Sequence, residues 1–255
     1  MEKVFEKEDY KLVYSEHFVE NKILWESHCH ARFELIAVLE GGVMLETEGV
    51  RRPLSKGQLL VLPPLLYHSI IAEQRCTYRR VTVLFDSAML PPVLKEAFIS
   101  KALLFPVLSS SLLSSLEAIA PLADTPYYTP LFEAVLLQIF YEYTSLEPKE
   151  ESGVKDASLL RILDYVEAHL CEPLSLDGIA AHLAISKSSL CHLFRQKMNI
   201  SLKQYVLQKR LALADKLLRE GVPPTEVATR ISYEGYANFY RSYRKRFGHA
   251  PSRKK

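Results

Sequence analysis

The sequence predicts a multidomain protein of α and β structure, with an N-terminal β-barrel followed by helices and a C-terminal all-α domain. Three observations predict this fold class. The chain has 255 residues, which is enough for two domains that each bury a core. Short strand-like runs give way to apolar residues at helical spacing after residue 108. Residues 1–153 hold 14 Lys and Arg against 21 Asp and Glu, whereas residues 154–255 hold 18 against 9, so the C-terminal part is expected to bind a polyanion.

The composition excludes several other classes of protein. With 48% hydrophobic and 24% charged residues, the chain has the composition of a globular protein and not of a disordered or fibrous one. No apolar run reaches the roughly 18 residues of a membrane span, and the charged N-terminus lacks the apolar stretch of a signal peptide. The cysteines at positions 29, 76, 171 and 191 show no CxxC spacing and are expected to be reduced thiols. We therefore expect a cytoplasmic protein without a membrane partner.

Residues 1–108 are predicted to form the β-domain. Short runs of strand-forming residues are cut by turn residues, which is typical of a sandwich or a small barrel. The runs are Leu35–Leu39, Val43–Leu45, Gln58–Leu62 and Arg80–Phe85. The turns between them contain Gly41, Gly42, Gly57, Pro63 and Pro64.

Residues 109–146 are predicted to be a helical coupling and dimerisation region. Ser109–Leu122 and Pro130–Tyr143 both carry apolar residues at helical spacing. One face of the first helix is a stripe of Leu112, Leu116 and Ile119. This stripe is expected either to carry the contact between two copies of the chain or to pack on the outside of the barrel. The charged residues 147–156, which include Pro148 and Gly153 and lack large apolar anchors, are predicted to be a linker.

Residues 157–255 are predicted to form an all-α domain that contains an internal repeat. Residues 179–185 align with residues 227–233 at an offset of 48, and Leu190–Arg195 aligns with Phe239–Arg244 at an offset of 49. Each copy is a short helix, a tight turn and a longer helix, which is helix-turn-helix geometry. The motifs are predicted at about residues 176–197 and 225–246. Their second helices can enter successive major grooves of double-stranded DNA, about 34 Å apart.

The stretch from Ile162 to Pro251 resembles the DNA-binding domain of the AraC/XylS family of bacterial transcription regulators. The resemblance covers about 90 residues. It is carried by Pro173–Leu176, Ile179, Ala180, Ile185, Ser186, Leu190, Phe194, Arg195, Arg210, Leu211, Ala214, Leu217, Leu218, Val227, Ala228, Phe239, Tyr243–Lys245, Phe247, Gly248 and Pro251. Two positions depart from the family pattern, because Ser232-Tyr233 stands where Gly-Phe is usual and Asn199 stands where Gly is usual.

The resemblance also implies which residues contact DNA. Base contacts are expected at Ser188, Cys191 and His192 of the first motif and at Tyr236, Asn238, Tyr240 and Arg241 of the second. Phosphate contacts are expected at Lys187, Arg195, Arg244, Lys245 and Arg246. Arg241 is the strongest candidate for base reading, because an arginine can bond guanine O6 and N7 together.

The acidic part contains four residues that can form a metal or effector site. His28, His30 and Glu34 are expected on one face of a strand with Cys29 on the other face, and His68 is expected to join them from a second strand. Imidazoles and a carboxylate that converge in this way can hold a divalent transition metal. The spacing resembles both motifs of the cupin superfamily, a barrel that often serves AraC-type regulators as the sensing domain. Leu65 departs from the pattern, which has glycine there, and is expected to fill space beside the site.

The hypothesis that unites these features is a DNA-binding transcription activator. A small molecule, for example a sugar, is expected to bind at His28, His30, Glu34 and His68, with or without a metal ion. The expected partners are double-stranded DNA, RNA polymerase and a second copy of the chain, and no catalytic residues are expected. One alternative is a metal-dependent cupin enzyme, such as an isomerase or dioxygenase, fused to a DNA-binding module. Another is a regulator controlled by a partner protein.

Overall fold

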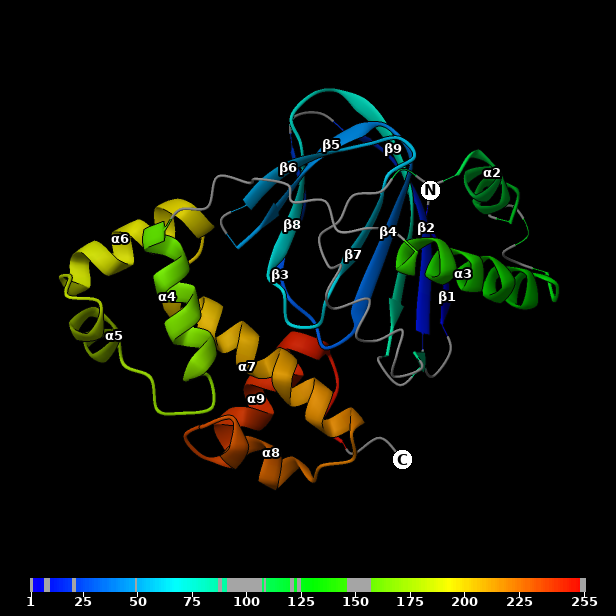
Figure 1. The fold of residues 1–255 in the computed structure, drawn as a ribbon. Coiled ribbons are helices and arrows are strands. Elements are labelled where there is room, and N and C mark those ends of the chain that lie inside the picture. Colours follow the sequence, from blue (N-terminus) through cyan, green and yellow to red (C-terminus); the bar gives the residue numbers. More distant parts are fainter. Residues whose placement is uncertain are drawn as a thin grey trace.

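The computed structural model describes residues 2–6, 10–19, 22–48, 50–86, 89–90, 107, 109–119, 122, 125–145 and 157–252. These residues form a β-domain with two helices beside it and a helical domain that contains the C-terminal third (Figure 1). The fold class predicted from the sequence is therefore confirmed. The predicted linker at residues 147–156 lies outside the described residues, and its boundaries stay a prediction.

The β-domain consists of two antiparallel sheets. The first has five strands in the order β1 (Glu2–Glu6), β2 (Tyr10–Val19), β9 (Cys76–Phe85), β4 (Phe33–Glu40) and β7 (Leu59–Leu62). The second has four strands in the order β3 (Lys22–His28), β8 (His68–Ala72), β5 (Gly42–Thr47) and β6 (Val50–Ser55). Within the described residues, no strand pairing joins the two sheets into a closed barrel.

Strand β4 explains how the five-stranded sheet is buried on both faces. All residues from Phe33 to Leu39 are buried, as expected for a continuous apolar run. Because successive side chains point to opposite faces, Leu35 and Ala37 belong to a core on the outer face of the sheet, whereas Ile36 and Val38 belong to the core between the two sheets. The strand thus connects the interior of the β-domain with the helices that cover its outer face.

Helices α2 (Ser110–Ile119) and α3 (Tyr128–Thr144) cover that outer face (Figure 1). The predicted stripe of Leu112, Leu116 and Ile119 is buried there, at 0%, 2% and 8% exposure. The second of the two expectations for this stripe is therefore the one observed: it packs on the sheet. A contact between two copies of the chain would have to use another surface.

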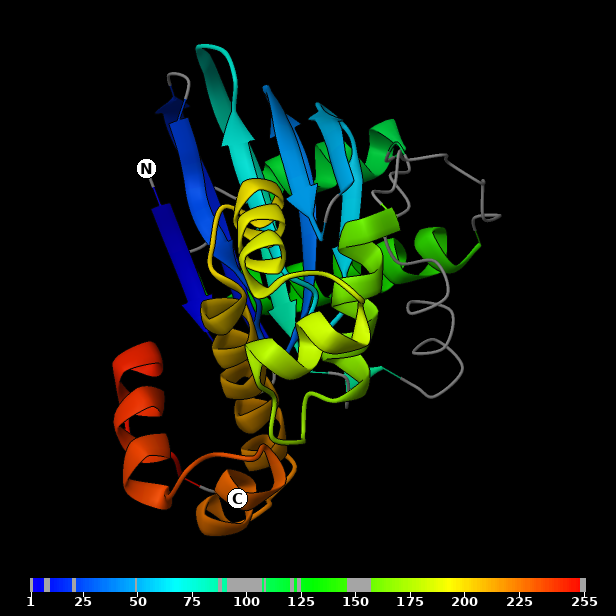
Figure 2. The same cartoon turned by 90° about the vertical axis from the view of Figure 1, so that its left-hand side faces the viewer.

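The helical domain has two cores that share one long helix. The helices are α4 (Ala157–Ala168), α5 (Leu176–His182), α6 (Lys187–Met198), α7 (Leu202–Arg219), α8 (Pro224–Arg230) and α9 (Tyr236–Phe247). The first core is formed by α4, α5, α6 and one part of α7, and the second by α8, α9 and the other part of α7. Figure 2 shows α6 in yellow near the centre of the view and α9 in red at its lower left, with α7 between them. None of the described helices is sufficiently long and hydrophobic to traverse a lipid bilayer.

Candidate functional site

The repeat found in the sequence folds as two helix-turn-helix motifs with the same turn. In the first motif the N–H of Ile185 donates to the carbonyl of Ala180, and in the second the N–H of Tyr233 donates to the carbonyl of Ala228, at 3.1 and 3.0 Å. The residues before these donors, Ala184 and Ser232, both have a left-handed backbone, with φ of +56° and +52°. Both turns thus adopt a conformation that usually favours glycine.

The two unusual residues noted in the sequence fit the motif in different ways. At Ser232 the left-handed backbone is supported by the side chain, whose hydroxyl donates to the carbonyl of Cys171 at 2.6 Å. Asn199 ends α6 with φ of +56°, and Gly248 ends α9 with φ of +79°. Asparagine is the residue that most often replaces glycine at such a helix end, so both departures preserve the fold.

The residues expected to read bases lie on the outer side of the two longer helices, α6 and α9. Ser188, His192, Tyr236, Asn238 and Arg241 are exposed, and Cys191 and Tyr240 are half-buried. On α9, Arg241 Nη2 donates to Asn238 Oδ1 at 2.5 Å, so the two side chains orient each other. Residues of α6 that face the opposite way, Leu190 and Phe194, are fully buried in the core. The helix therefore presents its predicted DNA-reading side to solvent.

The residues expected to contact phosphates are also exposed, but two of them have partners within the protein. Lys187 Nζ donates to Asp177 Oδ2 at 2.9 Å. Arg246 Nη2 donates to the carbonyl oxygen of Cys29, a residue of the β-domain, at 3.3 Å. The remaining three are Arg195, Arg244 and Lys245, all exposed.

A hollow of about 900 Å³ lies between the two motifs. Its lining includes the apolar residues Leu176, Val206 and Leu207 and the polar residues Lys187 and Asn238. The hollow thus lies between a predicted phosphate contact of the first motif and a predicted base contact of the second. It is part of the predicted DNA-facing side of the domain and is separate from the histidine residues of the β-domain.

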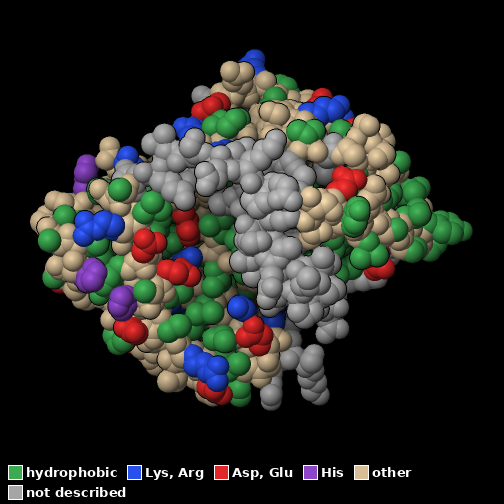
Figure 3. All heavy atoms as spheres, viewed as in Figure 1, with side chains coloured by type: hydrophobic (Ala, Val, Ile, Leu, Met, Phe, Trp, Pro, Cys, Tyr) green, Lys and Arg blue, Asp and Glu red, His purple; other side chains and the backbone are tan. Residues whose placement is uncertain are grey.

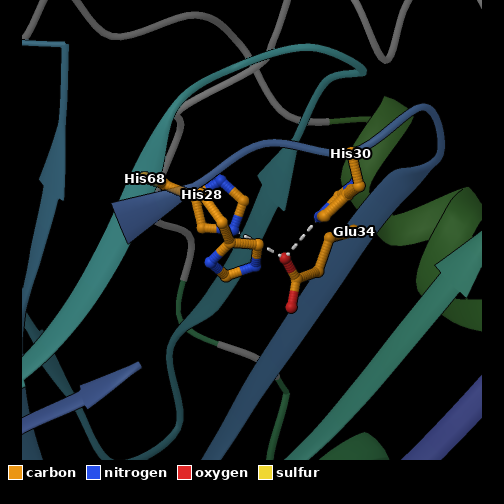
Figure 4. A group of neighbouring side chains, drawn as sticks. All are labelled: His28, His30, Glu34 and His68. Atoms are coloured by element: carbon orange, nitrogen blue, oxygen red, sulfur yellow. Dashed lines mark hydrogen bonds and ion pairs between the residues drawn. The ribbon is translucent and has the colours of Figure 1, made fainter. Parts of the chain in front are cut away.

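The four residues singled out in the β-domain converge on one point (Figure 4). His28, His30, Glu34 and His68 each offer a ligand atom, and these atoms all lie within 4.8 Å of one another. The expected origin of three of them on one strand is wrong. His28 ends β3 of one sheet, Glu34 lies on β4 of the other sheet, and His30 lies in the segment that crosses between the sheets. We call these four residues the histidine cluster.

Backbone carbonyls fix the orientation of two imidazole rings in the cluster. His30 Nδ1 lies 2.8 Å from the carbonyl oxygen of Arg32, and His68 Nδ1 lies 2.9 Å from that of Leu66. A carbonyl oxygen only accepts hydrogen bonds, so both Nδ1 atoms carry a hydrogen. Each ring then presents Nε2 to Glu34 Oε2, at 2.9 Å in both cases. This carbonyl-supported arrangement is the one that histidine ligands of metals have in proteins.

The two Nε2 atoms converge on one oxygen of the buried Glu34 side chain, at 2.9 Å each. Burial by itself would raise the pKa of Glu34, but the contacts with His30 and His68 outweigh it and hold the pKa well below its ordinary value. Glu34 is therefore a carboxylate, and the donor set of three imidazoles and one carboxylate suits a divalent transition metal.

Comparison with known proteins agrees with both halves of this description. A model of the AraC-like ligand binding domain matches residues 13–163, and a model of a helix-turn-helix domain matches residues 179–255. The first match alone covers more than half of the chain. The chain belongs to the AraC family of transcriptional regulators.

Individual AraC-family relatives are distant. The Msm operon regulatory protein of Streptococcus mutans is 23% identical over 226 residues, which are 85% of this chain and 81% of that protein. The probable transcriptional regulator LumQ of Photobacterium leiognathi is 30% identical over 105 residues, which are 41% of this chain and 42% of LumQ. A crystal structure of apo ToxT from Vibrio cholerae is 11% identical with a TM-score of 0.44 and covers 96% of both chains. The curated relatives are named as transcriptional regulators, in agreement with the expectation of a regulator and not an enzyme.

In this AraC-family protein, sequence reasoning missed the residues that join the two domains. They are Glu48, Asp86, Tyr205, Lys209 and Arg219. Lys209 is the clearest of them, because a lysine at only 3% exposure must have charged partners. No local pattern marks these residues, since the partners are more than 130 positions apart in the sequence. Leu65 was expected beside the effector site, and its side chain packs against the core of the helical domain.

Proposed function

We propose that this AraC-family protein acts in the cytoplasm as a transcription activator whose DNA binding responds to an effector at the histidine cluster. Helices α6 and α9 read DNA, and the promoter-bound protein contacts RNA polymerase. Support for the DNA-reading part comes from the two equivalent motifs and their exposed polar faces. The names of the relatives support regulation of transcription as the task of the chain.

The observation that carries the effector site is the convergence of two carbonyl-supported imidazoles on one buried carboxylate oxygen. His28 completes the set, with its ring 4.6 Å from that of His68 and 5.8 Å from that of His30. These residues would hold a divalent transition metal, which would supply a positive centre for hydroxyl or carboxylate groups of an effector. Without a metal, the same imidazoles and Glu34 would bond the hydroxyl groups of a sugar-like molecule.

The exposed face of α3 is the surface that we propose for a homodimer. Tyr127, Leu131, Leu137 and Tyr141 are between 44% and 72% exposed and lie at or beside one face of the helix. Hydrophobic side chains gather over this part of the molecule in Figure 3. Their opposite neighbours on α3, such as Phe132 and Ile139, are already buried against the sheet. A second copy of the chain would cover the apolar face that remains.

The experiment that tests the effector site is a thermal-shift screen on the full chain. Candidate ligands are Zn²⁺, Ni²⁺, Fe²⁺ and a panel of sugars and sugar acids, each measured on the wild type and on a variant with His28→Ala and His30→Ala. A true ligand raises the melting temperature of the wild type and leaves that of the double variant unchanged. Equal shifts in both proteins would place the effector elsewhere. Tyr141→Lys tests the dimer by sedimentation velocity, with Gln74→Lys, an exposed position in the turn between β8 and β9, as the control.

A further inference from the structure

The hollow between the two helix-turn-helix motifs has the size of a ligand pocket. Its volume of about 900 Å³ lies within the range of sites that hold small organic molecules, about 300–1,000 Å³. Its walls come from both motifs and from α7, which lies between them (Figure 2). All of its described lining residues belong to the helical domain. The hollow is therefore a second candidate site, distinct from the histidine cluster.

Part of the lining is apolar and accessible to solvent. Leu174, Leu176 and Val206 are only partly buried against the first core of the helical domain. Leu207 on α7 is 38% exposed. The phosphates of DNA offer no apolar group to these side chains, whereas the apolar body of a small molecule would remove them from water. The lining thus fits a small organic molecule.

Arg210 of α7 brings a positive charge to the hollow that no carboxylate compensates. Its Nε donates to the carbonyl oxygen of Leu170 at 2.9 Å, and its Nη1 donates to that of Ser232 at 3.3 Å. Its Nη2 donates to the carbonyl oxygen of Glu172 at 2.5 Å. No described carboxylate pairs with this arginine, and burial lowers its pKa. Because a guanidinium has five N–H groups and three are used here, two remain for a ligand.

Two lysines add to the positive charge of the hollow. Lys203 is exposed and has no acidic partner within the described part of the chain. Lys187 contacts Asp177 at 2.9 Å and contributes less. Glu234 is the single acidic residue of the described lining, so three basic residues face one acidic residue. The excess of positive charge favours an anionic ligand.

Three helices begin at the hollow and favour the same charge. Lys187 is the first residue of α6, Leu202 is the first of α7 and Asn238 is the third of α9. The N-terminus of a helix carries a partial positive charge. No side chain caps the first turn of α9, because Gly235 stands at the cap position. These partial charges add to the uncompensated charge of Arg210.

We propose that the hollow binds an organic anion with an apolar body, such as an aromatic carboxylate, and that this anion and DNA exclude each other. The carboxylate pairs with Arg210 and Lys203, and the apolar body packs on Leu207 and its apolar neighbours. The bound anion places a negative charge between the two surfaces that must approach DNA phosphates. Binding of the anion does not depend on the histidine cluster, whereas the exclusion of DNA rests on the proposed DNA-reading side.

The binding is tested with 2-naphthoate and the full chain by isothermal titration calorimetry. Two reference compounds separate the contributions: 2-naphthamide has the same apolar body without the charge, and inorganic phosphate has the charge without the apolar body. We expect naphthoate to bind at least about tenfold more tightly than either compound. Equal binding of naphthamide would overturn the role of the charge, and equal binding of phosphate would overturn that of the apolar lining. Absence of naphthoate binding at about 1 mM would overturn the site.

Two substitutions at one position locate the bound probe. Leu207→Glu and Leu207→Gln both replace the exposed leucine with a good helix former of the same shape, and only the first adds a negative charge. We expect Leu207→Glu to bind naphthoate at least about threefold more weakly than Leu207→Gln, because like charges repel. Equal affinities would place the probe elsewhere and overturn the site.

The histidine cluster provides the second control of location. The variant with His28→Ala and His30→Ala should bind naphthoate as tightly as the wild type does, because these residues lie outside the hollow. Loss of binding in this variant would place the probe at the histidine cluster and overturn the second site, whatever the screen of metals and sugars shows.

The exclusion of DNA is tested by fluorescence anisotropy with the full chain and a fluorescein-labelled duplex of random sequence. Naphthoate at about ten times its own dissociation constant should raise the apparent dissociation constant for DNA about tenfold in the wild type, and at most about fourfold in Leu207→Glu. The reference samples contain sodium chloride at the same ionic strength, because salt alone weakens DNA binding. Unchanged DNA affinity of the naphthoate-bound wild type would show that both ligands bind together and would overturn the exclusion.

Discussion

The two helix-turn-helix motifs have the same backbone but different surroundings. The core of the first motif includes Cys29 and Tyr67 of the β-domain, whereas the core of the second, around Phe239 and Tyr243, is built from the helical domain alone. A repeated unit has thus acquired one copy whose packing depends on the other domain and one copy that is complete by itself. The β-domain completes the core of the first copy, whereas it meets the second copy through the polar contacts of Arg246 and Arg219.

The exposed faces that are expected to read DNA also differ between the two motifs. Helix α6 offers short or neutral side chains at its expected base contacts, Ser188 and Cys191, whereas α9 offers Arg241 and Asn238, which hold each other in place. Arginine and asparagine make the most specific contacts with guanine and adenine. We infer that the second motif supplies most of the sequence discrimination and that the first mainly positions the protein on DNA.

The largest expected effects come from removing the central phenylalanine of each core. Phe194→Ala and Phe239→Ala should each lower the free energy of unfolding by about 3–5 kcal/mol, because both side chains are fully buried. Denaturant unfolding measures this loss. Only Phe194→Ala should also speed the alkylation of Cys29 by iodoacetamide, followed by mass spectrometry. Cys29 is buried in the first core, and Phe194 packs there on Tyr205, at the contact between the two domains. Equal acceleration by Phe239→Ala would show that the second core depends on the β-domain as well.

The next largest difference between the two motifs is expected in the recognition of bases. Arg241→Ala should cost roughly 1–3 kcal/mol at one base pair of a selected binding site and relax the preference there, whereas Ser188→Ala should cost less than about 0.5 kcal/mol. Affinities for single-base variants of a site selected from random DNA measure both. If Arg241→Ala weakened binding to all variants uniformly, Arg241 would be a phosphate contact and the division of tasks would fail.

The sequence predicts the motifs well because their signals are local. The two helix-turn-helix motifs follow from the spacing within each repeat, and His28, His30 and Glu34 follow from the spacing within one short segment. His68 follows from a second motif further along the chain. The passage of the chain from one sheet to the other at the cluster could not be predicted, because nothing in the sequence from His28 to Glu34 marks it. The contact of Glu48 with Lys209 is also invisible in the sequence, since a buried lysine and an exposed one look the same there. The stripe of α2 was ambiguous for a related reason: its period shows which residues are buried but not what buries them.

A smaller difference is expected in the salt dependence of the two motifs. Lys245→Ala should lower the slope of log affinity against log salt concentration by about one, the contribution of one phosphate. Lys187→Ala should lower it less, because Lys187 must first leave its 2.9 Å contact with Asp177. Titrations of DNA binding at several salt concentrations compare the slopes. Asp177→Asn provides the control, because it removes the partner of Lys187. In a protein with Asp177→Asn, the substitutions Lys187→Ala and Lys245→Ala should lower the slope by the same amount.

The smallest effect, and the one that isolates a single hydrogen bond in each motif, is expected from two buried tyrosines. Burial raises the pKa of Tyr205 and of Tyr243, and the neighbouring carboxylates of Glu48 and Asp215 raise both further. A raised pKa stabilises the fold below pH about 10, where the phenol is protonated in both states, and this contribution is lost as the pH rises further, because the unfolded chain ionises first.

Tyr205→Phe and Tyr243→Phe should each cost about 1 kcal/mol at neutral pH and reduce the loss of stability above pH about 10. Melting curves between neutral and alkaline pH measure both effects. Alkylation of Cys29 then tells the motifs apart, because only the hydroxyl of Tyr205 bonds the β-domain directly. If only Tyr205→Phe speeds the alkylation of Cys29, the contact between the two domains depends on the first motif. Equal acceleration by Tyr243→Phe would mean that the contacts through Asp215, Arg219 and Asp86 hold the β-domain just as firmly, and that both motifs sense it.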